Sequence, residues 1–364
     1  MTQRDEGPTL VAVLADPQLA TPLNDAQWSR LVSTARHANL LGALSGRLKA
    51  AQILIPARAS RHLDGAHQLS DRQHRSVRWE VHQLQAALGH LSIPIVLLKG
   101  AAYVLSAHSL GQGRLFGDID ILVPRTALGE VESQLMLHGW VSAKTSAYDQ
   151  RYYRQWMHEI PPMSHIRRAT VLDVHHTILP LTARHKPDPQ QILSRALPVS
   201  EPGLPAIRVP CPEDLVIHSI VHLVHEGELH NGLRDLNDIH SMLGKFGSMP
   251  GFWTRLAAHA IGNDLSGPVS FGLALVQQVF GTPVPVVVRE QLTQAQRGRR
   301  PSTLLLATFG LALEPPQPDE QNPAVAIAQW LIYVRSHSLR MPLRLVVPHL
   351  ARKTWLAWFP DKER

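Results

Sequence analysis

Two aspartates separated by one residue, Asp118 and Asp120, are the residues of this chain best placed to do chemistry. They lie in or beside an apolar run, 119–123, that is typical of a buried strand. Side chains at i and i+2 of a strand point to the same face, so the two carboxylates would lie side by side. Mg²⁺ binds carboxylate and phosphate oxygens together and would relieve their repulsion. The alternative is an exposed edge strand with two solvated acids.

A turn of small residues, Lys99-Gly100-Ala101, precedes this pair and follows an apolar run at 93–98. The run predicts a strand and residues 101–109 predict a helix, so the turn lies where a helix begins. Unpaired N–H groups and the positive end of the helix dipole favour an anion there. The turn lacks the Gly-x-x-x-x-Gly-Lys-Ser/Thr pattern of a P-loop, and a plain strand–helix connection is the alternative.

A third carboxylate, Asp173, lies in the segment Val171-Leu172-Asp173-Val174-His175. If this segment is a strand, Asp173 and His175 share one of its faces. On a strand next to the first pair, Asp173 would bridge a metal or act as a general base toward an attacking hydroxyl. A cross-strand ion pair with Arg167 or Arg168 is the alternative.

Three histidines, His218, His222 and His225, follow the spacing i, i+4 and i+7 on a predicted helix and form one stripe. A zinc site, and with it a zinc hydrolase, is one interpretation. The His-Glu-x-x-His pattern of zinc proteases is absent. The other interpretations are a packed helix face, imidazoles hydrogen-bonded to Asp235 or Asp238, and imidazoles that line a catalytic cleft.

The elements that must position these residues are predicted helices on both sides of a small α/β centre. We expect one helix over 24–50, capped by Asn24, and a second from Ser70 to 88. Within the centre, 152–160 and 169–175 have strand character. The later helices are expected at 212–226, 233–245, 252–261, 266–280 and 323–336. The predicted organisation is an N-terminal helical region (1–90), a core (91–180), a proline-rich linker (181–212) and a C-terminal helical domain (213–364).

Several segments together resemble the poorly characterised bacterial nucleotidyltransferases of the DNA polymerase β superfamily. The central signature is Leu97-Leu98-Lys99-Gly100-Ala101, then Arg114, then Asp118-Ile119-Asp120-Ile121-Leu122-Val123. His158-Glu159-Ile160-Pro161-Pro162-Met163 is similar to the family's His-x-x-Pro-Pro-Leu segment, and Leu172-Asp173-Val174-His175 to its acidic-x-His strand. Pro212-Glu213-Asp214-Leu215 and Arg234-Asp235-Leu236-Asn237-Asp238-Ile239 look like its helical region, so the likeness covers roughly residues 25–280.

The resemblance implies an α+β fold with a polymerase-β-like core, a small mixed sheet with helices between flanking helical regions. It implies two Mg²⁺ ions, with Mn²⁺ as a substitute, held by the catalytic residues Asp118, Asp120 and Asp173. The triphosphate of ATP or another NTP would lie near Lys99, Gly100 and Ala101. Arg114 would be its cationic contact and His175 would line the same site.

The expected function is therefore Mg²⁺-dependent transfer of a nucleoside monophosphate from an NTP to a hydroxyl or phosphate acceptor. The usual superfamily loop is Gly-Ser or Gly-Gly, whereas Ala101 offers no hydroxyl to a phosphate. The alternative is a catalytically degenerate module of the same fold that binds nucleotide or nucleic acid. The residues leave the acceptor open among a small molecule, a sugar, a peptide, a protein and RNA.

Composition adds weaker constraints. A formal net charge of +7 and a pI of about 9.8 suit a polyanionic partner. The single cysteine, Cys211, permits no internal disulfide, and no apolar leader precedes residue 8, so we expect a cytoplasmic protein without a transmembrane segment. The basic, apolar segment 334–364 predicts packing on the protein itself, with peripheral membrane contact as the alternative.

Overall fold

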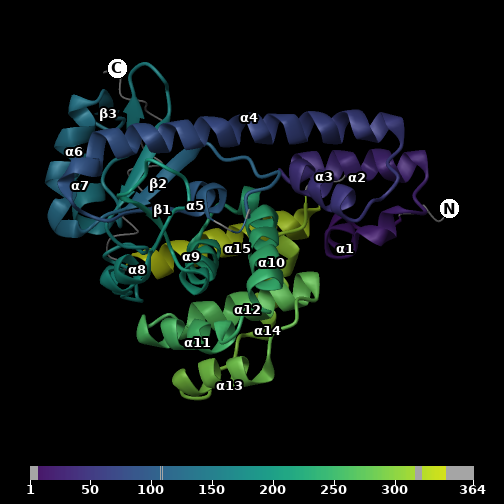
Figure 1. The fold of residues 1–364 in the computed structure, drawn as a ribbon. Helices are drawn as coiled ribbons and strands as arrows, with labels where there is room; N and C mark the ends of the chain where they lie inside the picture. Colours follow the sequence, from purple (N-terminus) through teal and green to yellow (C-terminus); the bar gives the residue numbers. More distant parts are fainter. Residues whose placement is uncertain (1–6, 107, 109, 316–321, 342–364) are drawn as a thin grey trace.

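The computed structural model describes residues 7–106, 108, 110–315 and 322–341. Its centre is one mixed sheet of seven strands in the order β3-β4-β5-β2-β1-β7-β6. The strands are β1 (Ile95–Leu98), β2 (Asp118–Leu122), β3 (Trp140–Ser142), β4 (Met163–His165), β5 (Val171–His175), β6 (Leu197–Pro198) and β7 (Ile207–Val209). Along the chain, helical regions precede and follow the segment that forms this sheet (Figure 1). The expected α+β class is confirmed.

The sheet brings together strands that are distant in sequence. β2 pairs with β1 in the antiparallel sense and with β5 in the parallel sense. β1 is buried along its whole length, which explains why its sequence is a continuous apolar run rather than an alternating one. β2 and β5 are therefore central neighbours, and their polar residues lie at matched positions.

The N-terminal region is helical. It contains α1 (Leu10–Ala15), α2 (Asp25–His37), α3 (Leu41–Ala50) and α4 (Ala57–Leu88), with a short 3-10 turn, η1 (Pro17–Ala20), after α1. Figure 1 shows α4 running above the sheet, with α2 and α3 beside one end of it. Asn24 caps α2 as predicted, and the side chain of Gln27 accepts from the backbone N–H of Asn24 in return.

Two predicted helix boundaries in this region are wrong. The single helix expected over 24–50 is two helices, because the chain turns at Asn39, which has a positive φ of 55°. The helix expected to begin at Ser70 begins at Ala57, directly after Pro56. Ser70 is a buried position inside it, where its hydroxyl donates to the backbone carbonyl of Arg114.

The centre contains a further correction. Residues 152–160 were expected as a strand, but α7 (Ala147–Trp156) is a helix capped by Ser146. Its aromatic residues favour strands by composition, yet Tyr148, Tyr152 and Trp156 recur at helical spacing and their rings pack together. The helix expected over 101–109 is α5 (Lys99–Leu105). The other central helices are α6 (Leu128–Leu137) and the short turns η2 (Gly89–Leu91) and η3 (Arg125–Ala127).

The proline-rich segment 181–212 contains regular structure. It includes α8 (Pro189–Arg195), β6 and β7, and β7 pairs in parallel with β1. A segment expected as a linker thus supplies one edge of the sheet. The domain boundaries themselves remain predictions.

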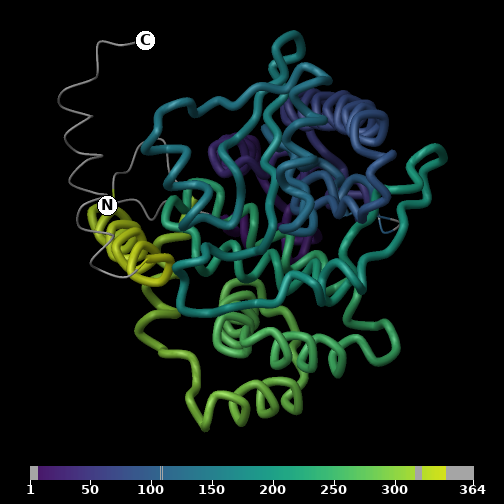
Figure 2. The backbone as a smooth tube through the Cα atoms, turned by 90° about the vertical axis from the view of Figure 1, so that its left-hand side faces the viewer, coloured from purple at the N-terminus to yellow at the C-terminus, as the bar shows by residue number. Residues whose placement is uncertain are grey.

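The C-terminal region is helical, as predicted. It contains α9 (Pro212–His225), η4 (Leu229–Asn231), α10 (Gly232–Phe246), α11 (Phe252–Gly262), α12 (Ser266–Phe280), α13 (Val286–Ala295), α14 (Thr303–Ala312) and α15 (Pro323–Arg340). Figure 2 shows these green helices gathered below the teal sheet region, with yellow α15 along one side. α9 is buried on nearly every face and joins the sheet region to the C-terminal helices.

The start of the basic C-terminal segment packs on the protein. Arg335 donates to the backbone carbonyl of Val224, and Arg340 donates to that of His225 and to Glu226. The rest of that segment, 342–364, lies outside the described residues. Among the helices that the structure describes, none combines the length and apolar character needed to cross a lipid bilayer.

Candidate active site

The three aspartates singled out in the sequence lie together on the two central strands. The parallel register of β2 and β5 places Asp120 opposite Asp173, and Asp118 lies two residues earlier on β2. One carboxylate oxygen from each lies within 4.8 Å of the other two. We call Asp118, Asp120 and Asp173 the acidic group. Their proximity follows from the strand register, which the sequence motifs alone do not specify.

Lys99 points into the acidic group. It is the first residue of α5 and has a positive φ of 43°, a conformation that is uncommon for a residue with a side chain. Its Nζ lies 2.7 Å from Oδ1 of Asp120. Burial lowers the pKa of Lys99, but the charge and hydrogen bond of Asp120 outweigh burial and raise it, so the ammonium is charged.

His175 makes a second contact with the same oxygen. It lies two residues after Asp173 on β5, and its Nε2 donates to Oδ1 of Asp120 over 3.0 Å. The same nitrogen lies 3.4 Å from Glu159. Burial would lower the pKa of His175, but the hydrogen bond to Asp120 and the charge of Glu159 raise it. Asp120 is thus held between two cations, which outweigh its burial and keep its pKa well below the usual range.

The pKa values of the other two aspartates, Asp118 and Asp173, are raised instead. Burial and the neighbouring charge of Asp120 raise the pKa of Asp118. Burial raises the pKa of Asp173 to about 7, together with the charges of Glu159 and Asp120. Oδ1 of Asp173 is also buried without a hydrogen-bond partner. Clustered carboxylate oxygens with one unsatisfied member are the ligand set that Mg²⁺ or Mn²⁺ prefers, so these residues fit a divalent cation.

A cavity of about 450 Å³ opens beside the acidic group. Its volume falls in the range of small-molecule sites. We call it the nucleotide cavity after the ligand that the sequence predicts for this site. Five of the predicted site residues line it, namely Lys99, Gly100, Arg114, Asp118 and Asp120. His222, Arg234 and Asp235 from the C-terminal helices also line it. Helices α9 and α10 therefore close the site over the sheet.

Three predicted nucleotide-binding residues have other surroundings. Ala101 and His175 are each only 1% exposed, and neither is among the residues that line the cavity. Arg114 lines the cavity, but its guanidinium is buried between Asp235, at 3.1 Å, and Asp238. Burial lowers the pKa of Arg114, and the charges of the two aspartates outweigh burial and raise it. Arg114 thus anchors the segment before β2 to α10.

The predicted histidine stripe does not act as a unit. His222 lines the nucleotide cavity, His218 is buried in α9, and Nδ1 of His225 bonds the carbonyl of Val221. Among the described residues, the groups placed to hold a metal include none of these three histidines. Of the interpretations considered, the cleft-lining one applies to His222.

Glu159 is the site residue that the sequence did not single out. It forms an isolated bridge with His175 and lies against both His175 and His158. Glu159 lies within the segment His158-Glu159-Ile160-Pro161-Pro162-Met163, and this motif can be recognised in the sequence. Its relation to His175 depends on the fold of the segment after α7, which no spacing in the sequence indicates.

The α+β fold and the acidic group are compatible with the class of protein that the sequence resembles, the nucleotidyltransferases. The chain matches an uncharacterised nucleotidyltransferase family over residues 24–281. This match covers well over half of the chain, and the chain belongs to that family. A comparison with curated proteins finds no matching relative.

Proposed function

We propose that the protein transfers a nucleoside monophosphate from an NTP to an acceptor hydroxyl or phosphate in a reaction that depends on Mg²⁺ or Mn²⁺. The observation that carries this proposal is the acidic group. One carboxylate oxygen from each of its three aspartates lies within 4.8 Å of the other two, and Asp118 and Asp120 line the nucleotide cavity. Divalent ions bound there would polarise the α-phosphate and favour deprotonation of the acceptor.

The chain's own residues have distinct roles in this proposal. Asp118, Asp120 and Asp173 would hold the cations, and His175 with Glu159 would orient Asp120. Lys99 and Arg234 face the triphosphate from the wall of the nucleotide cavity. The acceptor oxygen forms a bond to the α-phosphorus as the bond to the β-phosphate breaks, and pyrophosphate leaves. Asp173, whose Oδ1 has no hydrogen-bond partner and whose pKa is raised to about 7, would accept the proton of the acceptor.

A binding module without turnover is the second candidate. It is favoured by the ion pair of Lys99 with Asp120 and by the burial of Ala101, which removes a side-chain contact from the phosphate turn. Such a module would bind nucleotide with no release of pyrophosphate.

Labelled nucleotides test the two candidates. The protein is incubated with cell extract, Mg²⁺ and each NTP, labelled at the α- or the γ-phosphate. We expect α-label, and not γ-label, to become attached to one fraction of the extract with release of pyrophosphate. Asp118→Asn should abolish this transfer, whereas Asp264→Asn, which changes an exposed carboxylate, should not. Nucleotide binding without transfer in every fraction would favour the binding module.

A further inference from the structure

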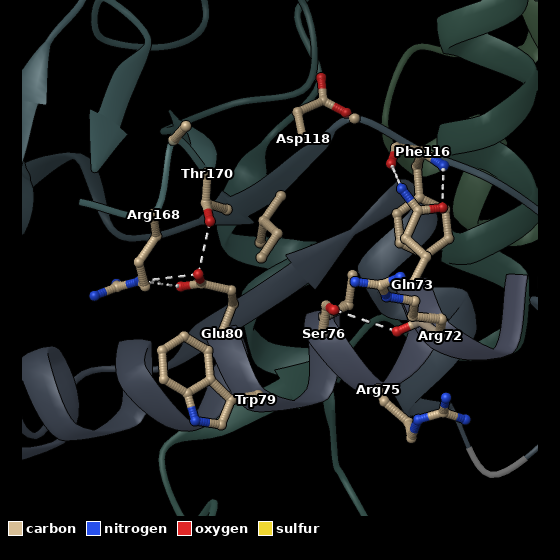
Figure 3. A pocket seen from close by; sticks show the side chains of 14 residues that line it. Arg72, Gln73, Arg75, Ser76, Trp79, Glu80, Phe116, Asp118, Arg168 and Thr170 are labelled. Atoms are coloured by element: carbon tan, nitrogen blue, oxygen red, sulfur yellow. Dashed lines mark hydrogen bonds and ion pairs between the residues drawn. The ribbon is translucent and has the colours of Figure 1, made fainter. Parts of the chain in front are cut away.

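A second cavity, of about 860 Å³, adjoins the nucleotide cavity at Phe116, Gly117 and Asp118. One wall is a face of α4, and the other is formed by the segment that enters β2 and by the turn between β4 and β5. Figure 3 shows Asp118 across the cavity from α4, with Trp79 and Arg168 toward one end and Arg72 and Phe116 toward the other. A molecule bound here would contact Asp118 from outside the nucleotide cavity.

The α4 wall carries unpaired positive charge. Arg72, Arg75 and Trp79 follow the spacing i, i+3 and i+7 and share one helix face. Both arginines are exposed, and within the described residues neither guanidinium has an ion-pair partner. Arg168, in contrast, is paired with Glu80 at 2.9 Å. As far as the described residues go, the cavity therefore offers two guanidinium groups without an ion-pair partner to an anionic ligand.

The same wall offers an aromatic surface. The indole of Trp79 is 50% exposed, which is unusual for so large an apolar group. Arg168 lies over its ring at 5.3 Å and leaves the remaining surface open. A ligand with a planar ring would bury the exposed part of the indole by stacking. Arg72 and Trp79 lie about 10 Å apart along the helix axis. A ligand that reaches both residues is therefore longer than a single charged group.

The opposite end of the cavity is held in place. The side-chain amide of Gln73 donates to the backbone carbonyl of Phe116 and accepts from its backbone N–H at 3.2 Å. The ring of His74 stacks on that of Phe116 with centroids 5.7 Å apart. These contacts tie the segment before Asp118 to α4, so the cavity is preformed beside the acidic group.

We propose that this cavity, which we call the acceptor groove and define by Arg72, Arg75, Trp79, Phe116 and Asp118, binds the end of a single-stranded nucleic acid. The proposal rests on the function proposed above and assigns the acceptor as the terminal hydroxyl of that strand. Phosphates pair with Arg72 and Arg75, and a base stacks on Trp79, the combination by which proteins hold single strands. An acidic peptide would form ion pairs with Arg72 and Arg75 but would supply no base to stack on Trp79.

Binding of a short fluorescent oligoribonucleotide, followed by anisotropy, tests this proposal. The double variant Arg72→Glu, Arg75→Glu should weaken binding by at least about thirtyfold and reduce the slope of log K against log salt by about 1.4, or ~0.7 per phosphate contact. Arg58→Glu with Arg61→Glu is the matched control, because it changes the same charge on the exposed surface of the same helix, about 20 Å away. The control should weaken binding by no more than about threefold.

The variant Trp79→Ala distinguishes recognition of a base from recognition of phosphate charge alone. It should weaken oligoribonucleotide binding by about tenfold and leave binding of inorganic polyphosphate unchanged. Equal losses in the arginine variant and its control would overturn the proposal, since net charge alone would then explain binding. Competition by polyglutamate as strong as by RNA, with no effect of Trp79→Ala, would overturn it in favour of an acidic protein partner.

The stabilisation of the protein by ATP and Mg²⁺, read as a thermal shift, distinguishes failure of the groove from failure of the proposed function. The arginine variant should retain this shift. If the wild type shows the shift but binds no oligoribonucleotide, the acceptor groove is wrong and the function stands. If groove-dependent RNA binding occurs without any nucleotide shift, the proposed function is wrong and the binding site stands.

Discussion

Lys99 and Asp120 form an ion pair inside the acidic group, with Nζ 2.7 Å from Oδ1. The ammonium lies beside the carboxylate that a divalent cation would use. Lys99 and a metal therefore compete for part of the same negative charge, while Lys99 also offsets the repulsion between Asp118, Asp120 and Asp173.

Lys99→Met should strengthen Mn²⁺ binding by about tenfold, because removal of the ammonium leaves the acidic group more negative, an effect of ~1.4 kcal/mol. It should also lower the free energy of unfolding by about 2 kcal/mol, since Asp120 is 2% exposed and keeps only His175 as a cationic partner. Calorimetric titration and urea unfolding measure the two effects, with the exposed Lys144→Met as control. Weaker Mn²⁺ binding would instead mean that Lys99 positions Asp120 for the metal.

His222 should make stability depend on pH. Burial lowers the pKa of His222 to about 4, with the charge of Lys99 adding to this, while Asp235, Glu226 and Asp120 oppose it. The imidazole of His222 takes up a proton near pH 6.5 in the unfolded chain but only near pH 4 in the folded protein. The free energy of unfolding therefore falls as the pH decreases from 6.5 toward 4.

His222→Gln removes this contribution. Between pH 7 and pH 5, the wild type should lose about 1 kcal/mol more unfolding free energy than the variant. Urea unfolding at the two pH values measures the difference. Equal losses in both proteins would show that the imidazole is as easily protonated in the folded state as in water.

Arg114→Met should destabilise the protein by about 3–5 kcal/mol, because Asp238 would lose its buried cationic partner and Asp235 one of two. Arg234→Gln should instead lower nucleotide affinity at little cost in stability, since Arg234 lines the nucleotide cavity with less burial. Chemical unfolding and nucleotide titration of both variants separate the two roles. A stable Arg114→Met variant that has lost nucleotide binding would instead support the prediction that Arg114 contacts the phosphates.

Gly100→Ala should cost about 1–3 kcal/mol, because the added Cβ would lie 2.7 Å from the ring of Phe116, which Gln73 holds against α4. Any shift of Phe116 would also displace Asp118, two residues later. Gly65→Ala is the matched control, since its added Cβ meets nothing within 4 Å and it lies inside α4. The control should gain about 0.5–1 kcal/mol. Unchanged stability of Gly100→Ala would indicate that Phe116 moves freely.

The sequence was most informative where a local pattern and the fold agree. Apolar runs predicted β1 and β2, and the i, i+2 spacing placed Asp118 and Asp120 on one face. The later helices followed from apolar residues at helical spacing. The resemblance named the family that residues 24–281 match.

The errors have physical causes that a single sequence does not reveal. Tyr152 and Trp156 favour strands individually, but their rings pack edge to face along a helix. β7 is too short to stand out among prolines, yet it is stabilised by pairing with β1 across more than a hundred residues of sequence. Glu159 and the ion pairs of Arg114 are tertiary contacts, so no spacing indicated them.

The most direct test of the central claim is a titration of the metal-free protein with Mn²⁺, followed by electron paramagnetic resonance. We predict that the wild type binds Mn²⁺ and that Asp118→Asn and Asp120→Asn each weaken binding by at least about tenfold. Asp264→Asn should bind as the wild type does, and circular dichroism should confirm that every variant is folded. Unchanged Mn²⁺ binding in folded Asp118→Asn and Asp120→Asn proteins would contradict the assignment of the acidic group as the metal site.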